Sequence, residues 1–143
     1  MAALSVAFVI PDVLLAHGWG FLMNNGVINT EFQLKKLYPN STFRITVIET
    51  VDPGDPATQR SLALAQTHDA VVLCGGQLTG AAYTVAAAYA NVSVLLVGGP
   101  VNPALTNMLV SFPSDADELY ALGTLLARMS ATKRIGLHMG MRS

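Results

Sequence analysis

The chain has 143 residues, of which 52% are apolar and 12% are charged, and its formal net charge is −1. This length suits one domain with a substantial core and is short for two. The charged share is about half the usual value, so the chain is not of the disordered class, and some apolar surface is expected to meet a partner. No basic cluster occurs, which argues against nucleic acid or an anionic membrane surface as that partner.

A single cysteine, Cys74, excludes an internal disulfide and a cysteine-based metal cluster. The three histidines, at 17, 68 and 138, are too scattered to predict a metal site, so we expect neither a metal nor a cofactor. The longest apolar run is about one strand long, which predicts no transmembrane helix. No charged leader precedes the first predicted strand, so neither a signal peptide nor a lipid-anchor cysteine is expected.

The first predicted strand covers residues 4–10 and breaks at Pro11 and Asp12. A long helix is then predicted over residues 19–37. Within it, Phe21, Ile28 and Phe32 recur at helical spacing, which predicts that their stripe faces the core. The β-branched stretch at 41–51 predicts the second strand.

The turn cluster at residues 52–56 introduces a second helix, with Asp55 as its predicted N-cap and Pro56 in its first turn. This helix is expected to end near Thr67. The third predicted strand, 69–74, is apolar throughout, as expected of a strand covered on both faces. A glycine-containing loop at 75–80 leads to an alanine-rich helix at about 81–90.

Further strands are predicted at 92–97, 107–112 and 134–139, with a fourth helix between the last two. That helix opens on a capping-box pattern at 114–117 and carries a stripe of leucines. The order β-α-β-α-β-α-β-β-α-β predicts a doubly wound, mostly parallel, three-layer α/β fold of flavodoxin-like strand order, as one domain over 1–143. A last strand with no helix after it predicts an uncovered sheet face that a partner or a second lobe covers.

Ligands of such sheets bind beyond the carboxyl ends of the strands, where the winding direction reverses. At that edge, Trp19 could stack on a planar ring of a ligand or pack in the core. His17, two residues earlier, is expected to be a solvent-facing loop residue. Gln77 offers a donor and an acceptor that suit reading a base edge or capping the next helix. Gly98 and other glycines at the same predicted edge suit either close backbone approach to a ligand or tight turns.

Several other functions lack their required residues. A phosphoacceptor domain of this topology needs a carboxylate at the end of the third strand, where Cys74 and two glycines stand. Residues 11–16 contain no glycine, so the dinucleotide-binding pattern is absent, and no P-loop or nucleophile elbow occurs. Cys74 itself fits a small buried residue or, as an alternative, the nucleophile of a small α/β enzyme.

Three segments resemble one family. Residues 8–26, with Phe8-Val9 followed by the run from Ala16 to Phe21, resemble the first strand, loop and helix start of the basic membrane protein family. Residues 69–72 resemble its third strand, and the segment 111–136 resembles a later motif of the same family. These segments span nearly the whole chain and correspond to about the first half of a family member.

That family comprises purine-nucleoside-binding lipoproteins of ABC importers, built as two-lobed clamshells of periplasmic-binding-protein type. The resemblance implies that residues 1–143 form the N-terminal lobe of a non-catalytic binding protein for a nucleoside-like ligand. It implies that Trp19 is the aromatic plate, that His17 and Asn24 border the site, and that Phe21 supports it. Ala16 replaces the family's loop aspartate, a departure that bears on the identity of the ligand.

The resemblance further implies a membrane-anchored protein at the cell surface or in the periplasm, completed by a second lobe or a like subunit. Gln77 and Gly98 are the predicted ligand contacts from the other loops. Two alternatives remain. One is a ligand-sensing or interaction domain without a transport role, and the other is a small α/β enzyme that uses Cys74 or His17.

Overall fold

The computed structural model describes residues 3–11 and 19–111. For Ala3 and residues 19–21 it describes the backbone but not the side chains. By contacts the chain separates into two units, 1–112 and 113–143, and every described residue belongs to the first. The helix and strand predicted after residue 112 lie outside the described residues. The assignment of 1–143 to one lobe of a larger protein therefore stays a prediction.

Five parallel strands form one sheet in the order β2-β1-β3-β4-β5. They are β1 (Ala3–Val9), β2 (Thr42–Ile48), β3 (Ala70–Cys74), β4 (Ser93–Val97) and β5 (Met108–Ser111). The connecting helices are α1 (Trp19–Leu37), α2 (Asp55–Ala65) and α3 (Thr79–Ala88), with the short 3-10 helix η1 (Gly76–Leu78) before α3. Residues 98–107 join β4 to β5 without a helix.

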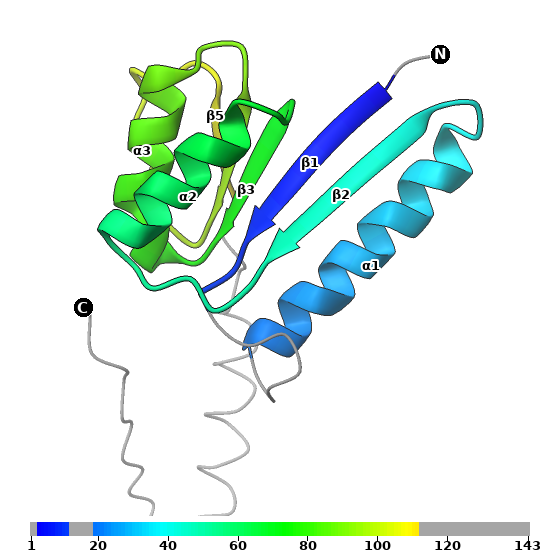
Figure 1. The fold of residues 1–143 in the computed structure, drawn as a ribbon, viewed down its shortest axis with the longest axis horizontal. Helices are drawn as coiled ribbons and strands as arrows, with labels where there is room; N and C mark the ends of the chain where they lie inside the picture. The colour runs from blue at the N-terminus through cyan, green and yellow to red at the C-terminus, as the bar shows by residue number, and fades with distance from the viewer. Residues whose placement is uncertain (1–2, 12–18, 112–143) are drawn as a thin grey trace, which may run out of the picture. The chain divides into compact units, whose positions relative to one another are not determined.

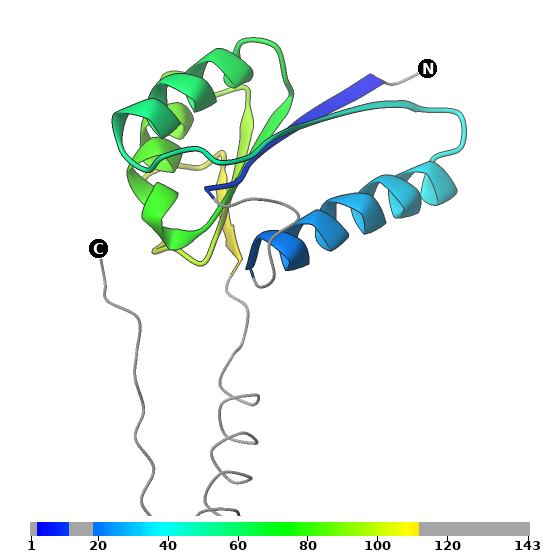
Figure 2. The same ribbon diagram turned by 60° about the horizontal axis from the view of Figure 1, so that its bottom comes forward.

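Helices cover both faces of the sheet, as Figures 1 and 2 show. On one face α2 and α3 pack on Val9, Val71, Leu73 and Leu96. On the other, α1 contributes Val27 to a cluster with Phe8, Ile10, Val72 and Cys74. The predicted doubly wound, three-layer α/β fold is therefore confirmed for the described part of the chain.

Local sequence explains the central elements. All but the first residue of β3 are buried, because this apolar strand has a strand on each side and helices above and below. Small side chains line the inner side of α3, namely Ala81, Ala82 and Ala86 beside Val85, so the helix lies close to the sheet. None of the described helices is long and apolar enough to cross a membrane.

The expected core-facing stripe of α1 is wrong. Ile28 is 57% exposed and Phe32 is 62% exposed, while Val27, with 6% exposure, faces the sheet beside Met23. Successive residues lie about 100° apart around a helix, so one position separates a buried side chain from an exposed one. The Phe21 side chain lies outside the described residues.

The start of α2 also differs from its prediction. The N-cap is Gly54, with φ of 92° and no side-chain cap, and Asp55 is the first helical residue rather than the cap. Pro56 does lie in the first turn, as predicted. The left-handed backbone at Gly54 turns the chain into the helix at a position where a side chain would be strained.

Candidate functional site

The carboxyl ends of the five parallel strands meet at one edge of the sheet, next to the first turn of α1 (Figure 1). The winding direction reverses between β1 and β3, because β1 leads outward to β2 and β3 leads the other way to β4. A crevice is expected at such a point in an open α/β sheet. Ile10 and Pro11 lie on its β1 side, and Gly75 to Gln77 lie on its β3 side.

Two glycine turns shape the β3 and β4 ends of this edge. Gly75 has φ of 136° and Gly98 has φ of 83°, backbone conformations that L side chains rarely adopt. The Gly75 N–H donates to the Val97 carbonyl oxygen at 3.0 Å, and the Gly98 N–H donates to the Ser111 carbonyl oxygen at 2.8 Å. The turns thus extend the sheet's hydrogen bonding past the strand ends and hold the loops in place.

Gly76 brings two backbones into contact. A Cβ at this position would lie 2.5 Å from the Gly98 carbonyl oxygen, so only glycine fits without a shift. The Thr79 hydroxyl donates to the Gly76 carbonyl oxygen at 2.6 Å and so ties the turn to α3. Of the two interpretations of these glycines, the tight turn is confirmed.

Gln77 lies on η1 with an exposed side chain that folds over Gly75. A Cβ on Gly75 would meet the Gln77 Oε1 at 2.6 Å, which places the amide directly above that turn. The N-cap of α3 is Leu78 and no side chain caps that helix, so the capping role considered for Gln77 is not observed. Its amide remains able to donate and accept at the edge of the crevice.

The other predicted site residues lie on or before α1. Trp19 is the first residue of the helix and Asn24 is half-buried in its second turn, while the side chains of Trp19 and Phe21 lie outside the described residues. His17 lies outside them altogether. The backbone therefore brings the start of α1, Gln77 and Gly98 to the same edge of the sheet, without fixing the contacts among their side chains.

Cys74 ends β3 directly before the glycine turn, but its side chain is 2% exposed and packs in the apolar cluster beneath α1. Burial raises the pKa of this thiol to about 12. The thiol is consequently protonated at neutral pH and is a poor nucleophile. The interpretation of Cys74 as a small buried residue is confirmed.

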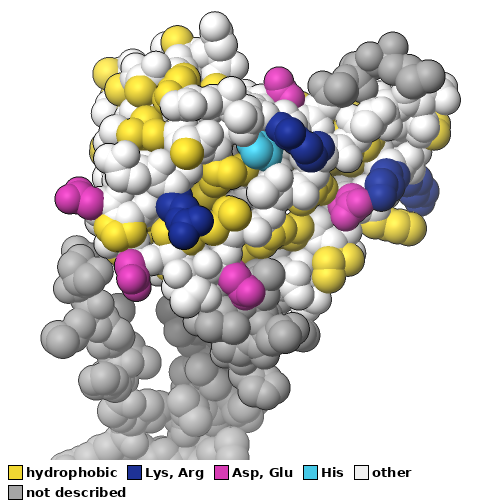
Figure 3. Space-filling view, in the orientation of Figure 1, with side chains coloured by type: hydrophobic (Ala, Val, Ile, Leu, Met, Phe, Trp, Pro, Cys, Tyr) yellow, Lys and Arg dark blue, Asp and Glu magenta, His cyan; other side chains and the backbone are white. Residues whose placement is uncertain are grey.

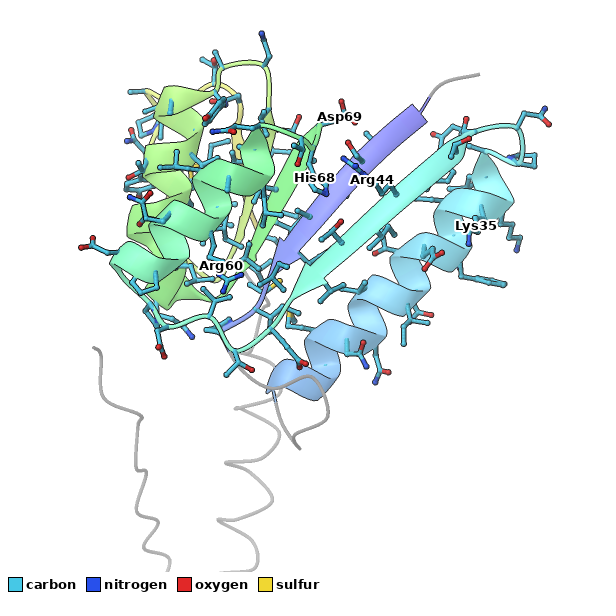
Figure 4. The ribbon with its side chains drawn as sticks, viewed as in Figure 1. Lys35, Arg44, Arg60, His68 and Asp69 are labelled. Carbon is cyan, nitrogen blue, oxygen red and sulfur yellow. The ribbon has the colours of Figure 1, made fainter. Side chains whose placement is uncertain are left out.

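A second group of polar residues lies at the amino end of the sheet (Figure 4). The Asp69 carboxylate accepts the Ser5 N–H at 2.7 Å and the Ser5 hydroxyl at 2.6 Å, and these bonds lower its pKa. His68 contacts the Leu64 carbonyl oxygen through Nδ1 and the Thr46 hydroxyl through Nε2, at 3.0 and 2.9 Å. These bonds join β1, β2 and α2, so we interpret this group of polar residues as stabilising the fold.

One feature of the carboxyl edge was missed by the sequence analysis. Thr50, after β2, has φ of 56°, which is uncommon for a β-branched residue. A hollow of about 220 Å³ opens around it in the loop between β2 and α2, with Glu49, Asp52 and Arg60 in its lining. The proline-rich turn at 52–56 indicated a loop there, but no local pattern marked it as concave. No group of potential metal ligands occurs among the described residues.

The fold and this edge define a doubly wound α/β protein with a candidate ligand site at its topological switch point. No protein-family model and no curated protein matches the chain. Its fold is similar to that of a solved structure named "putative lipoprotein from Peptoclostridium difficile 630 (fragment)", with a TM-score of 0.59 and 16% identity. That similarity covers 89% of this chain and 99% of the other, and at this identity it shows a shared fold.

Proposed function

We propose that this protein is a non-catalytic binding module for a small planar ligand of nucleoside type. The observation that carries the proposal is the pair of glycine turns at the switch point, where the chain turns at Gly75 and Gly98 and the Gln77 amide lies over Gly75. An aromatic plate suits stacking on a flat heterocycle, and Trp19, at the start of α1, is the residue that we propose for this role. Gln77 supplies the hydrogen-bonding group at the rim.

The wider role follows from two likenesses. The segments at 8–26, 69–72 and 111–136 resemble the purine-nucleoside-binding lipoproteins of ABC importers, in which such a unit forms the N-terminal lobe. The structural neighbour is named as a lipoprotein fragment and has the same fold. We therefore propose a solute-binding role in nucleoside uptake, at a cell surface or in a periplasm.

The chemistry of the described residues favours binding over catalysis. The Cys74 thiol is buried with a raised pKa, and both ring nitrogens of His68 contact groups that join the strands to α2. Neither residue offers an activated nucleophile or base at the crevice. These observations weaken the alternative of an enzyme that uses Cys74.

Trp19 is the single tryptophan of the chain, so intrinsic fluorescence reports on it directly. Titration with adenosine, guanosine and inosine is expected to change the emission, and Gln77→Ala is expected to weaken the response. Asn91→Ala, a change at an exposed position before β4, is the matched control and should leave the titration unaltered. Unchanged emission and unchanged amide NMR spectra with every nucleoside would refute the proposal.

A second candidate function is that of an interaction module, and the exposed apolar side chains of α1 favour it. Leu22, Ile28 and Phe32 are each more than half exposed on this helix. Light scattering over a range of protein concentrations tests the idea. If the protein is a monomer at every concentration, self-association through α1 is contradicted. If it forms a dimer that the Phe32→Glu variant does not form, self-association through α1 is supported.

A further inference from the structure

The segment that builds β3, α3, β4 and β5 contains no charged residue. The chain has eight Lys and Arg residues and nine Asp and Glu residues, and all of them lie outside residues 70–114. In Figure 3 the upper left of the view, where α3 lies, is yellow and white, and no charged side chain colours it. Depletion of charge is typical of the core of a protein–protein interface.

A shallow hollow of about 560 Å³ opens in this uncharged segment, between α3 and the loop that joins β4 to β5. Four residues of α3 and two of the loop line it, namely Tyr83, Thr84, Ala87, Ala88, Asn102 and Leu105. Parallel strands are usually joined through a helix, but the stretch 98–107 has none. The outward flank of α3 therefore has no helix beside it among the described residues.

The polar side chains of the hollow form hydrogen bonds within the chain. The Tyr83 hydroxyl donates to the Pro100 carbonyl oxygen at 3.0 Å, and the Thr84 hydroxyl donates to the Gly80 carbonyl oxygen at 2.9 Å. The Asn102 Oδ1 accepts a backbone N–H of its own loop at 3.1 Å. A lining bonded in this way favours an apolar occupant, and the bond between Tyr83 and Pro100 ties the loop to the helix before anything binds.

An exposed apolar side chain lies directly next to the hollow. Val101 comes between Pro100, which is bonded to Tyr83, and Asn102 of the lining, and it is 63% exposed. The same face thus carries an apolar hollow and an apolar projection. A two-fold axis can bring the projection of each copy opposite the hollow of the other, and two uncharged faces do not repel each other.

The composition of this face argues against two other classes of partner. Nucleic acid is bound through Lys and Arg residues, and residues 70–114 contain neither. A helix that lies on a membrane surface typically has Lys and Arg on its polar face, and α3 has none. A second copy of the chain needs no such charge.

We propose that this protein forms a two-fold homodimer in which Val101 of each copy enters the hollow between α3 and the loop 98–107 of the other. The interface is distinct from the exposed side chains of α1, on which the second candidate function depends. It also goes beyond the proposed ligand-binding function and does not depend on it.

Light scattering of the full chain over a wide range of concentrations tests this dimer, and the mass of the wild type is expected to double as concentration rises. Val101→Glu and Ala87→Lys each bring a charge to the apolar contact, so each variant alone should weaken the dimer about tenfold or more. An equimolar mixture of the two variants should dimerise again, because the carboxylate of one copy then meets the ammonium group of the other. Gln59→Lys, at an exposed position of α2, is the matched control and should leave the dimer unchanged.

Five results would overturn the proposal. They are a wild-type chain that is monomeric at every concentration, a dimer that both variants retain, and variants that stay monomeric when mixed. A dimer that Phe32→Glu abolishes and Val101→Glu retains would assign self-association to α1 instead. Binding of a monomeric chain to phosphatidylcholine vesicles, lost in Val101→Glu, would assign the face to a lipid surface.

Discussion

Single residues show how strongly burial governs chemistry in this protein. Cys74 and Ser61 are both almost completely enclosed, at 2% and 0% exposure, yet they differ in what burial does to them. The neutral thiol of Cys74 packs in an apolar cluster at little energetic cost, whereas burial disfavours its ionised form. The Ser61 hydroxyl has no hydrogen-bond partner among the described residues, so its desolvation is uncompensated.

Cys74 makes stability sensitive to alkaline pH. Its folded pKa of about 12 lies above the ordinary value of 9.0, so its contribution is complete below pH 9 and is lost as the pH rises toward 12. The loss should be on the order of 1 kcal/mol at pH 10. Urea unfolding at pH 8 and pH 10 should show a smaller decline in Cys74→Ala than in the wild-type chain, and equal declines would contradict the assignment.

Ser61→Ala is expected to stabilise the protein by about 0.5–1 kcal/mol, because it removes an unpaired buried hydroxyl and places a better helix former in α2. Urea unfolding measures the change. Ser93→Ala, at an exposed position of β4, is the control and should stay within about 0.5 kcal/mol of the wild type. A destabilised Ser61→Ala would mean that the hydroxyl has a partner after all.

At the scale of elements, the connections decide which faces are covered. The stretch 98–107 joins two neighbouring parallel strands without a helix, and the Asn107 side chain fastens its end. The Asn107 amide donates to the carbonyl oxygens of Ala86, Tyr89 and Val92, at 3.2, 3.0 and 2.9 Å. The end of α3, the start of β4 and the start of β5 are thereby tied at one point.

Asn107→Ala is expected to cost about 2–3 kcal/mol of unfolding free energy, because it leaves these carbonyl groups with fewer partners. Asn107→Asp should cost at least as much, since a carboxylate would face carbonyl oxygens. Thermal and urea unfolding give both values. Asn91→Ala provides the exposed control, and an Asn107→Asp variant as stable as the wild type would contradict the hydrogen-bond pattern.

The orientation of α1 can be checked in the same way. Phe32→Gln and Ile28→Gln should each change stability by no more than about 0.5 kcal/mol, since both side chains are more than half exposed. Val27→Ala should cost about 1–2 kcal/mol, because Val27 packs against the sheet. The opposite ranking would show that the stripe predicted from helical spacing faces the core.

At the scale of the molecule, the described residues would contact a ligand from one side only, at the carboxyl edge of the sheet. The described part of the candidate site consists of the loops after β3 and β4 and the end of β1. Small-molecule sites generally bury most of the surface of their ligand, which a single wall does not achieve. Leu109, 70% exposed on the same side of the sheet as Leu95, shows that the described helices also leave one end of a face open.

We therefore expect adenosine to bind this chain with a dissociation constant of about 100 μM or higher. This corresponds to a binding free energy no more favourable than roughly −5.5 kcal/mol. NMR titration covers this range, with sucrose as a non-planar control that should produce no shifts. A dissociation constant of a few micromolar would show that the crevice encloses its ligand more fully than one wall allows.

Sequence alone determined the class of fold, because hydrophobic periodicity and turn residues are local properties. The bounds predicted for α1 agree with the structure, and the apolar run of β3 was correctly predicted as a strand covered on both faces. For Gly75 and Gly98 the sequence allowed a tight turn or close approach to a ligand, and the structure shows the turns. The roles of Trp19, His17, Asn24 and Phe21 stay predictions that the resemblance supplies.

The tertiary structure decided what depends on distant neighbours. Which stripe of α1 faces the sheet was decided by packing on Phe8 and Ile10, and helical spacing by itself fitted more than one stripe. The approach of Gly76 to Gly98 joins residues 22 positions apart, and the left-handed turn at Thr50 lies in a loop that hydrogen-bonds to Ile10 of a distant segment. A sequence pattern records the local preferences of a chain, whereas concave surfaces arise only when separate strands end at one edge.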